Sequence, residues 1–438
     1  MERCENFKIG NPIFVGISCM SGLQIGYGLK FAQRIREENP SCPIIWGGVH
    51  PTLLPGQTAL NDYVDIVVRG EAESSIVDLA DAIENGRTLD DVPGITYKTD
   101  DTIKSNQEGQ LIRLDDIPLD LPFDLLPMGR YPAVNAGRFH MQTSRGCPHS
   151  CGFCYNSTFN KRKWRGKTAN RVLDEIEYIL KRFPNVKWID PVDDNFFVDQ
   201  KRVEQICRGL IERKIKVKWR ANCRFDYACR YDRNFIELLV KSGCTELDFG
   251  GESGSNRLLS IMNKEVTTDQ MIKSVENLGN WGPSIEPYVS WMSGLPTETT
   301  EDLNETFNLM DKMSETNPKT QHYGIFVYTP FPSPILKSLE KDGFNPPRSL
   351  EEWGNIDVFH FKPPWHTKAY VDKLHTVCAV TRYAFYPEAR LNERGGGYKF
   401  AYTILNHIAK YRWNHRYFGI PIELKLVNSS IRKRRGYL

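Results

Sequence analysis

The stretch SRGCPHSCGFCYN, residues 144–156, holds three closely spaced cysteines: Cys147, Cys151 and Cys154. Three thiolates this close in the chain repel one another unless they bind metal. A structural zinc site uses four ligands and commonly a second CxxC pair, and no such pair lies nearby. Iron–sulfur clusters are held by cysteine thiolates, ordinarily four, so three would leave one iron open. The spacing therefore predicts a metal cluster, and the alternative is three reduced loop thiols.

Strand and helix patterns alternate after this stretch in a way typical of a parallel barrel. Apolar strand patterns lie at 139–144, 186–190, 216–220, 244–250, 285–291 and 322–328, and helical patterns separate them at 168–182, 200–213, 232–242, 268–279 and 300–314. Six such β/α units predict a partial (β/α)6 barrel, whose chemistry lies at the carboxyl ends of the strands. The cysteines follow the first strand, so we expect them at that end.

A smaller α/β domain of Rossmann-like pattern precedes the barrel. Strand patterns at 12–18, 43–48 and 65–71 alternate with helical patterns at 23–37 and 74–83. Turn signals and many prolines then predict a linker with a hairpin formed by ITYKTDD and GQLIRL. The fold class is α/β, and the expected domains are an N-terminal α/β domain at 1–84, the linker at 85–137, the barrel at 138–330 and a mostly helical region with a basic tail at 331–438.

Composition excludes several classes of protein. The 438 residues are 40% hydrophobic and 25% charged, which is ordinary for a globular chain and excludes a disordered or small disulfide-stapled one. No apolar run reaches the length of a transmembrane helix, and the first residues lack the apolar region of a secretory signal. Eleven cysteines in such a chain are expected to be reduced thiols or metal ligands in the cytoplasm.

The last part of the chain is basic and aromatic. Residues 401–438 hold eight Lys or Arg side chains and one acidic residue, Glu423, although the whole chain has a net charge of only +3. The segment 411–426 could dock on a membrane surface to reach a lipid-like substrate, or contact nucleic acid, which the overall charge does not favour. The simpler alternative is a helix packed on the barrel with a solvated basic end.

The cysteine pattern, with Phe153 before the last cysteine and the flanking RGCP and FCYN, resembles the signature of the radical S-adenosylmethionine (SAM) enzymes. The resemblance covers residues 138 to about 330. It implies a 4Fe-4S cluster bound by Cys147, Cys151 and Cys154, with SAM on the open iron. It also implies reductive cleavage of SAM to a 5′-deoxyadenosyl radical that abstracts hydrogen from unactivated carbon, and an external one-electron donor such as flavodoxin or ferredoxin.

The resemblance also implies SAM contacts near the cluster and at the ends of the strands. The fourth-strand GGES and polar third-strand residues are expected near the ribose and methionine of SAM, and residues after the fifth strand near adenine. Alternatively, GGESG is only a β/α turn and Ser253 only the N-cap of the next helix. The expected contacts are Phe153, Tyr155, Asp194, Arg220, Asn222, Gly250, Gly251, Glu252, Ser253, Gly294 and Leu295.

VGISCMSGL (15–23), WGGVHPT (46–52) and VRGEAES (68–74) resemble the second half of a cobalamin-binding domain. Such domains precede the barrel in cobalamin-linked radical SAM enzymes, which include C-methylases and an anaerobic porphyrin-ester cyclase. Ser18, Gly47 and Gly48 match the positions that border the cobalamin nucleotide tail. The first strand–helix–strand is missing, so we expect an N-terminally truncated domain with weak or partial occupancy. No DxHxxG motif supplies a ligand to cobalt, and His50 is interpreted as a surface loop histidine.

Three functional hypotheses remain open. The first is cobalamin-dependent methylation of an unactivated carbon. The second is cobalamin-independent cyclisation, oxidation or rearrangement. The third is a non-catalytic cluster protein for electron transfer or regulation, which would need neither an open iron nor a polar barrel rim. The sequence assigns no catalytic residue and names no substrate beyond a small or lipid-like molecule.

Overall fold

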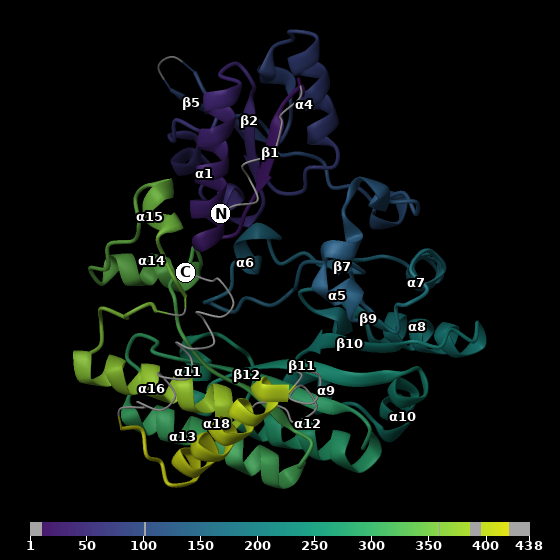
Figure 1. The fold of residues 1–438 in the computed structure, drawn as a ribbon, viewed down its shortest axis with the longest axis vertical. Helices are drawn as coiled ribbons and strands as arrows, with labels where there is room; N and C mark the ends of the chain where they lie inside the picture. Colours follow the sequence, from purple (N-terminus) through teal and green to yellow (C-terminus); the bar gives the residue numbers. More distant parts are fainter. Residues whose placement is uncertain (1–10, 100–101, 359, 386–395, 420–438) are drawn as a thin grey trace. The chain divides into compact units, whose positions relative to one another are not determined.

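The computed structural model describes residues 11–99, 102–358, 360–385 and 396–419. By their contacts the chain forms two compact units, each assembled from separate stretches (Figure 1). The N-terminal unit comprises 1–116, 148–163 and 330–358, and the barrel unit comprises 117–147, 164–329 and 359–438. The linear domain limits expected from the sequence remain a prediction.

A five-stranded sheet organises the N-terminal unit. Its strands, in sheet order, are β1 (Val15–Ser18), β2 (Ile44–Gly47), β3 (Ile66–Val68), β4 (Ile95–Lys98) and β5 (Ile103–Ser105). The first three are parallel, and the hairpin β4–β5 joins antiparallel beside β3. The hairpin was expected, but its second strand is not GQLIRL at 109–114. Thr99 and Thr102 close the turn earlier, through a 2.8 Å backbone hydrogen bond.

Helices cover both faces of this sheet. One core contains Ile25, Ile44 and Trp46 together with Trp353 from the distant stretch 330–358. A second core, around Leu79 and Ile95, lies on the other face. The helices of this unit are α1 (Leu23–Glu38), α2 (Val49–Leu53), α3 (Pro55–Ala59), α4 (Ser75–Glu84), α6 (Asn156–Phe159), α14 (Pro334–Lys341) and α15 (Leu350–Gly354).

Six parallel strands form the sheet of the barrel unit, which confirms the expected partial (β/α)6 barrel. In sheet order they are β13 (Gln321–Val327), β12 (Glu286–Ser293), β11 (Cys244–Glu252), β10 (Lys218–Cys223), β9 (Trp188–Pro191) and β6 (Arg138–Met141). Two short strands, β7 (Ser144–Arg145) and β8 (Arg165–Gly166), form a separate antiparallel pair.

Helices pack on the outer face of the barrel sheet (Figure 1). On β12 the side chains of Val289 and Trp291 are buried beneath them, while Ser290 and Met292 on the opposite face are only partly buried. The inner face therefore keeps room for polar groups. The helices of the barrel unit are α5 (Pro132–Asn135), α7 (Ala169–Arg182), α8 (Gln200–Glu212), α9 (Phe225–Ala228), α10 (Arg233–Lys241), α11 (Asn256–Ile261), α12 (Thr268–Trp281), α13 (Thr300–Thr316), α16 (Lys368–Ala384) and α18 (Gly396–Asn414).

The C-terminal aromatic segment packs against the barrel as far as the structure describes it. Trp413 is 3% exposed, stacks edge-on with Phe307, and donates a 2.7 Å hydrogen bond to Asp311. Arg416 also bonds Asp311, at 2.5 Å. This agrees with the packed-helix alternative for 411–419, and residues 420–438 lie outside the described chain. Among the described helices, none is both long and apolar enough to cross a bilayer.

Candidate active site

The turn after β9 anchors the start of the cysteine loop in the barrel unit. The buried carboxylate of Asp193 accepts hydrogen bonds from Thr143 N (2.7 Å), Thr143 Oγ1 (2.6 Å) and Ser144 Oγ (2.6 Å). Burial raises the pKa of Asp193, and these donors oppose the rise. Asp194 accepts a 3.0 Å bond from the amide of Gly146, which has a φ of 84°. Two consecutive carboxylates thus fix the backbone that leads into Cys147.

Asn195 continues this anchor. Its side chain is buried, and Nδ2 lies 3.8 Å from Cys147 Sγ. Arg202 from α8 also holds the start of the loop, because it donates 2.9 Å hydrogen bonds to both oxygens of Thr143. The loop carrying the first cysteine is therefore held by side chains from the next β/α unit.

Cys151 and Cys154 lie in the stretch 148–163, which belongs to the N-terminal unit. Cys154 N donates a 3.1 Å hydrogen bond to Cys151 O, and Gly152 O accepts one of 2.9 Å from Ile335 of α14. Tyr155, one of the expected SAM contacts, precedes α6 and packs edge-on with Phe159, while the expected contact Phe153 is partly buried.

The donor set of these cysteines fits an iron–sulfur cluster. All three are free of disulfides. Within the described residues, no three His, Cys, Asp or Glu side chains are arranged to hold one metal ion. In a cluster each thiolate binds its own iron, and cysteine sulfur is the soft donor that holds iron–sulfur clusters.

The third strand of the barrel, β10, carries two of the expected SAM contacts, Arg220 and Asn222. Arg220 lies in the middle of β10, not at its end, with Asp190, Glu246 and Asp248 within 3.7 Å. Desolvation lowers the pKa of Arg220, but the attraction of the nearby carboxylates is larger and raises it above its usual value. Asn222 is nearer the rim and donates a 2.8 Å hydrogen bond to Asp193 O. Of the two predicted SAM contacts on β10, only Asn222 lies at the strand end.

The fourth strand ends in a strained turn that carries an ion pair. Glu252 has a φ of 64°, which is unusual for a residue with a side chain. Its Oε1 lies 2.8 Å from Lys264 Nζ, and both side chains are largely buried. A Cβ on Gly250 would sit 2.2 Å from that same oxygen, so glycine makes room for the pair. Gly251 is similarly tight, against Val289 and Trp291.

Ser253 is fully buried in this turn. Its Oγ accepts a 3.1 Å hydrogen bond from Ser255 N and lies 3.4 Å from Thr306 Oγ1. The N-cap position of α11 is Ser255, so the alternative that made Ser253 the N-cap is wrong. The N-cap therefore lies two residues later than that alternative placed it.

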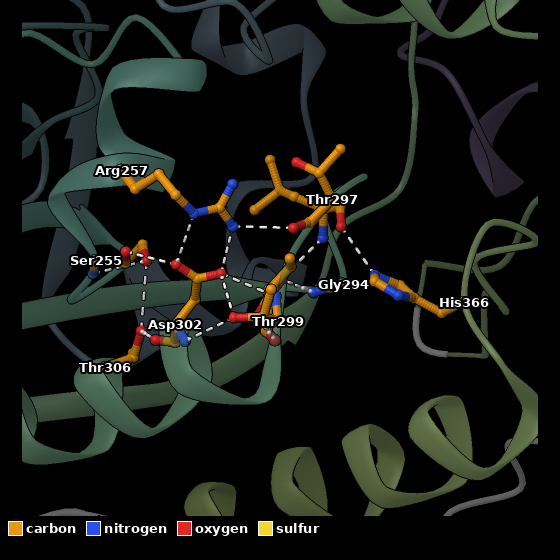
Figure 2. Close-up of polar contacts among 12 residues, drawn as sticks. Ser255, Arg257, Gly294, Thr297, Thr299, Asp302, Thr306 and His366 are labelled. Carbon is orange, nitrogen blue, oxygen red and sulfur yellow. Dashed lines mark hydrogen bonds and ion pairs between the residues drawn. The ribbon is translucent and has the colours of Figure 1, made fainter.

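In the loop after the fifth strand, side chains contact both the amides and the carbonyls of Gly294 and Leu295. Glu298 accepts hydrogen bonds from Gly294 N (2.5 Å) and Leu295 N (2.9 Å). Trp365 donates to Gly294 O at 2.9 Å. The His366 ring lies 2.8 Å from Leu295 O, and Figure 2 shows His366 beside this loop. These contacts fix the segment predicted to approach adenine.

Asp302, at the start of α13, joins this loop to the turn after β11. It accepts hydrogen bonds from Ser255 Oγ (2.6 Å), Thr299 Oγ1 (2.8 Å) and Arg257 (Figure 2). Burial opposes its charge, but these donors hold the pKa of Asp302 well below its usual range. The fourth and fifth strand ends thus share one anchoring carboxylate.

The rim of the N-terminal sheet holds the residues expected to border cobalamin. Ser18 is exposed at the carboxyl end of β1, and Gly47 and Gly48 end β2 beside it. Gly48 has a φ of 89°, and a Cβ there would lie 2.7 Å from Ser18 Oγ. The two glycines leave space for a bulky nucleotide tail, and the exposed Ser18 hydroxyl can hydrogen-bond it, so these residues fit the expected role.

His50 is not a surface histidine, so that interpretation is wrong. It is 0% exposed, its Nδ1 lies 2.9 Å from Ser21 Oγ, and its ring packs edge-on against Trp353. Burial lowers the pKa of His50 to about 4. Trp353, which covers the ring, lies in a distant part of the chain, so no local sequence pattern could predict the burial of His50.

Several residues of the site were not predicted from the sequence. Their partners are distant in the chain, so spacing gave no signal for them. A carboxylate two residues beyond GLP and an aromatic–histidine pair before a helix are the only local hints. These residues are Arg202, Lys264, Glu298, Asp302, Trp365 and His366.

Comparisons with known proteins match both parts of the chain. The model of the radical SAM superfamily matches residues 141–310, and the B12 binding domain matches residues 5–80. An uncharacterised methyltransferase of Pyrococcus horikoshii is 30% identical, covering 74% of this chain and 69% of its own. The anaerobic magnesium-protoporphyrin IX monomethyl ester cyclase of Rubrivivax gelatinosus is 29% identical, covering 68% of this chain and 53% of the cyclase.

A solved structure has the same fold. It is the radical SAM methyltransferase TsrM from Kitasatospora setae with cobalamin and a [4Fe-4S] cluster bound. The TM-score is 0.65 at 16% identity, over 92% of this chain and 89% of TsrM.

The chain therefore belongs to the radical SAM superfamily. Within it, this protein is an enzyme of the group that adds a B12-binding domain to the radical SAM domain. Its cofactors are a 4Fe-4S cluster, SAM and cobalamin.

Proposed function

We propose that this enzyme methylates an unactivated carbon of a small molecule by cobalamin-dependent radical SAM chemistry. One observation carries the proposal: a B12-binding match at 5–80 and a radical SAM match at 141–310 lie on the same chain. The Pyrococcus relative is named a methyltransferase, and so is TsrM, which supports methyl transfer over other radical reactions.

The cluster and SAM would be held at the rim of the barrel. When bound, the cluster supplies the electron that cleaves SAM, and cobalamin supplies a methyl group. Cys147, Cys151 and Cys154 are the proposed cluster ligands, and Asp193 and Asp194 hold the loop that leads into the first of them. The proposed SAM contacts are Phe153, Tyr155, Asp194, Arg220, Asn222, Gly250, Gly251, Glu252, Ser253, Gly294 and Leu295, as expected from the sequence.

The burial and ion pairing of three of these residues bear on the proposed SAM contacts. The ion pair with Lys264 and the positive φ keep Glu252 at the strand end, where its second carboxylate oxygen can accept from a ribose hydroxyl. Leu295 and Ser253 are buried, so they would shape the pocket through the backbone around them. Ser18, Gly47 and Gly48 are the proposed neighbours of the cobalamin tail.

The reaction needs an external one-electron donor, and flavodoxin or ferredoxin is the proposed class. A cytoplasmic location is also part of the proposal, because free thiols suit a reducing compartment. A membrane-surface contact through the C-terminal region stays a prediction. In its described part Trp413 is committed to packing, while Tyr411 and Tyr417 are exposed.

Anaerobic reconstitution tests the proposal. The full chain is loaded with iron, sulfide and hydroxocobalamin, freed of excess by gel filtration, and analysed for iron and cobalt. With SAM and a reductant, we expect retained cobalt and formation of both S-adenosylhomocysteine and 5′-deoxyadenosine. The Cys147/Cys151/Cys154→Ala variant is the control and should lose the iron–sulfur absorbance. Iron retained at the parent level in that variant would refute the ligand assignment.

Cyclisation without methyl transfer is the second candidate. It is favoured by the 29% identity to the anaerobic cyclase of Rubrivivax gelatinosus. The same experiment separates the two, because cyclisation predicts 5′-deoxyadenosine without S-adenosylhomocysteine. A cluster that binds but cleaves no SAM would instead indicate an electron-transfer or regulatory protein.

A further inference from the structure

Asn195 contacts the first cysteine of the cluster motif from a position with no solvent. It is 2% exposed and follows the two aspartates that anchor the loop. Its Nδ2 lies 3.8 Å from Cys147 Sγ, within reach of an N–H···S hydrogen bond. Phe196 and Phe197, each 2% exposed, pack into the core directly after it and fix its backbone. The packing of these two rings therefore holds the Asn195 amide close to the Cys147 sulfur.

The orientation of this amide is maintained at a cost. Asn195 Oδ1 is buried and has no hydrogen-bond partner among the described residues. A buried acceptor left unpaired is destabilising, so its presence in a folded protein calls for an explanation. Turning the amide over would place its oxygen lone pairs against a thiolate, which is repulsive.

We infer that Asn195 is a positioning residue that donates a hydrogen bond to the Cys147 thiolate and raises the reduction potential of the cluster. The inference rests on the proposed role of Cys147 as a cluster ligand. Reduction adds one electron from an external low-potential donor to the cluster, and no proton moves. The added negative charge is shared by the ligand sulfurs, so a donor aimed at one of them stabilises the reduced state more than the oxidised one.

Burial strengthens this effect. Asn195 is 2% exposed, and the low dielectric of such a buried position strengthens the hydrogen bond that its amide donates. The hydrogen bond is present in both redox states, so only the difference in its strength between them changes the potential. We therefore expect removal of the amide to lower the equilibrium constant for reduction by about tenfold, which is about 59 mV for one electron.

The test is a redox titration of Asn195→Leu in the reconstituted full chain. Leucine has nearly the same shape but no N–H, and it also removes the unpaired oxygen. The signal of the reduced cluster in electron paramagnetic resonance is followed against potential, with iron content as the measure of loading. We expect a more negative midpoint potential at unchanged iron content. An unchanged midpoint would overturn the inference.

Asn277 provides a matched control. It is also 2% exposed, and its Oδ1 is also unpartnered, but its Nδ2 donates to the backbone carbonyl of Cys229 at 3.3 Å. Asn277→Leu should therefore cause a similar loss of a buried amide and leave the cluster potential at the parent value. A shift equal to that of Asn195→Leu would mean that the potential follows general destabilisation, and would also overturn the inference.

A second variant keeps the test decisive if Asn195→Leu does not fold. Asn195→Asp keeps the size and polarity of the side chain but replaces the donor by an acceptor. Its midpoint should be more negative than that of the parent, and a midpoint at or above the parent value contradicts the inference. Failure of the parent chain itself to bind a cluster would instead refute the proposed ligand role of Cys147, so the two failures are distinguishable.

Discussion

At the scale of single residues, the site is built from charged groups that are buried only because each has a partner. Glu252 and Lys264 show this most clearly, with a 2.8 Å contact at the end of β11. Asp302 shows it again, with four donors around one carboxylate. Removing one partner of such a set leaves the other desolvated and unpaired, which makes these residues good probes of the rim.

We predict that Lys264→Met destabilises the protein strongly. It leaves the Glu252 carboxylate largely buried without its cation, and breaking a buried pair in this way costs about 3–5 kcal/mol. Urea unfolding of the cluster-free chain measures the loss. Glu252→Gln combined with Lys264→Met should recover most of it, because no unpaired charge remains. Equal losses in the single and double variants would show that the pair does not act as a unit.

A second residue-scale prediction concerns acid stability. His322 is 2% exposed and accepts a 3.0 Å hydrogen bond from Trp291 at Nδ1. Burial lowers its pKa to about 4 from an ordinary value near 6.5. The folded state therefore keeps this histidine neutral while the unfolded chain takes up a proton. Stability should fall as the pH drops from about 6.5 towards 4, by about 3 kcal/mol from this group alone.

Unfolding in urea at several pH values checks this. His322→Asn keeps an acceptor towards Trp291 but cannot take up the proton, so its stability should depend less on pH across that window. The exposed His407 offers a control, and His407→Gln should keep the pH dependence of the parent. If His322→Asn also keeps the full dependence, another group controls the acid response.

At the scale of elements, local patterns in the sequence predicted the sheets well. Strands β9 to β13 and their helices lie within a few residues of the expected ranges, because buried parallel strands read as short apolar runs between amphipathic helices. The hairpin partner of β4 was misplaced, since a strand of three residues with exposed side chains has little pattern to detect. The position of Arg220 in the middle of β10 was also missed, because strand ends are the least certain part of such a prediction.

What the sequence could not predict are the contacts that join elements. Glu298 illustrates this, because its role depends on Gly294 and Leu295 folding back over it and on Trp365 and His366 arriving from beyond β13. None of these contacts follows a helical or strand period. The cysteine motif, by contrast, is recognised from local spacing alone, and the ligand role of its three cysteines stays a prediction.

We predict that Glu298→Ala loosens the loop after β12. The amides of Gly294 and Leu295 would lose their acceptor in a buried setting, at roughly 1–3 kcal/mol for each unpaired group. Stability should fall, and SAM affinity of the cluster-loaded protein should fall with it if this loop borders adenine. Glu298→Gln retains an acceptor and should lie between the parent and the alanine variant. A stable protein with lowered SAM affinity would be a purely local effect, whereas unchanged affinity would remove the loop from the proposed SAM site.

At the scale of the whole molecule, two α/β units each present the carboxyl ends of parallel strands. This is where ligands bind in both barrels and open sheets. In the N-terminal unit, β1 has one neighbour among the described strands, and the hairpin β4–β5 extends the sheet on the opposite side, beside β3. Among the described residues of 85–137, no strand therefore pairs with the edge at β1.

Cobalamin retention should depend on the close approach of β1 and β2 at this rim. Gly48 has a φ of 89°, and an added Cβ would lie 2.7 Å from Ser18 Oγ and 2.9 Å from Cys19 O. Gly48→Ala must therefore both strain the backbone and displace the hydroxyl proposed to face the nucleotide tail. We expect cobalt retention after gel filtration to fall well below that of the parent, while iron content stays the same because no cluster ligand is touched. Gly56→Ala, where a Cβ would meet open space, is the matched control and should retain cobalt as the parent does. Parent-like cobalt in Gly48→Ala would show that the tail lies elsewhere, and equal losses in both variants would point to general damage of the sheet.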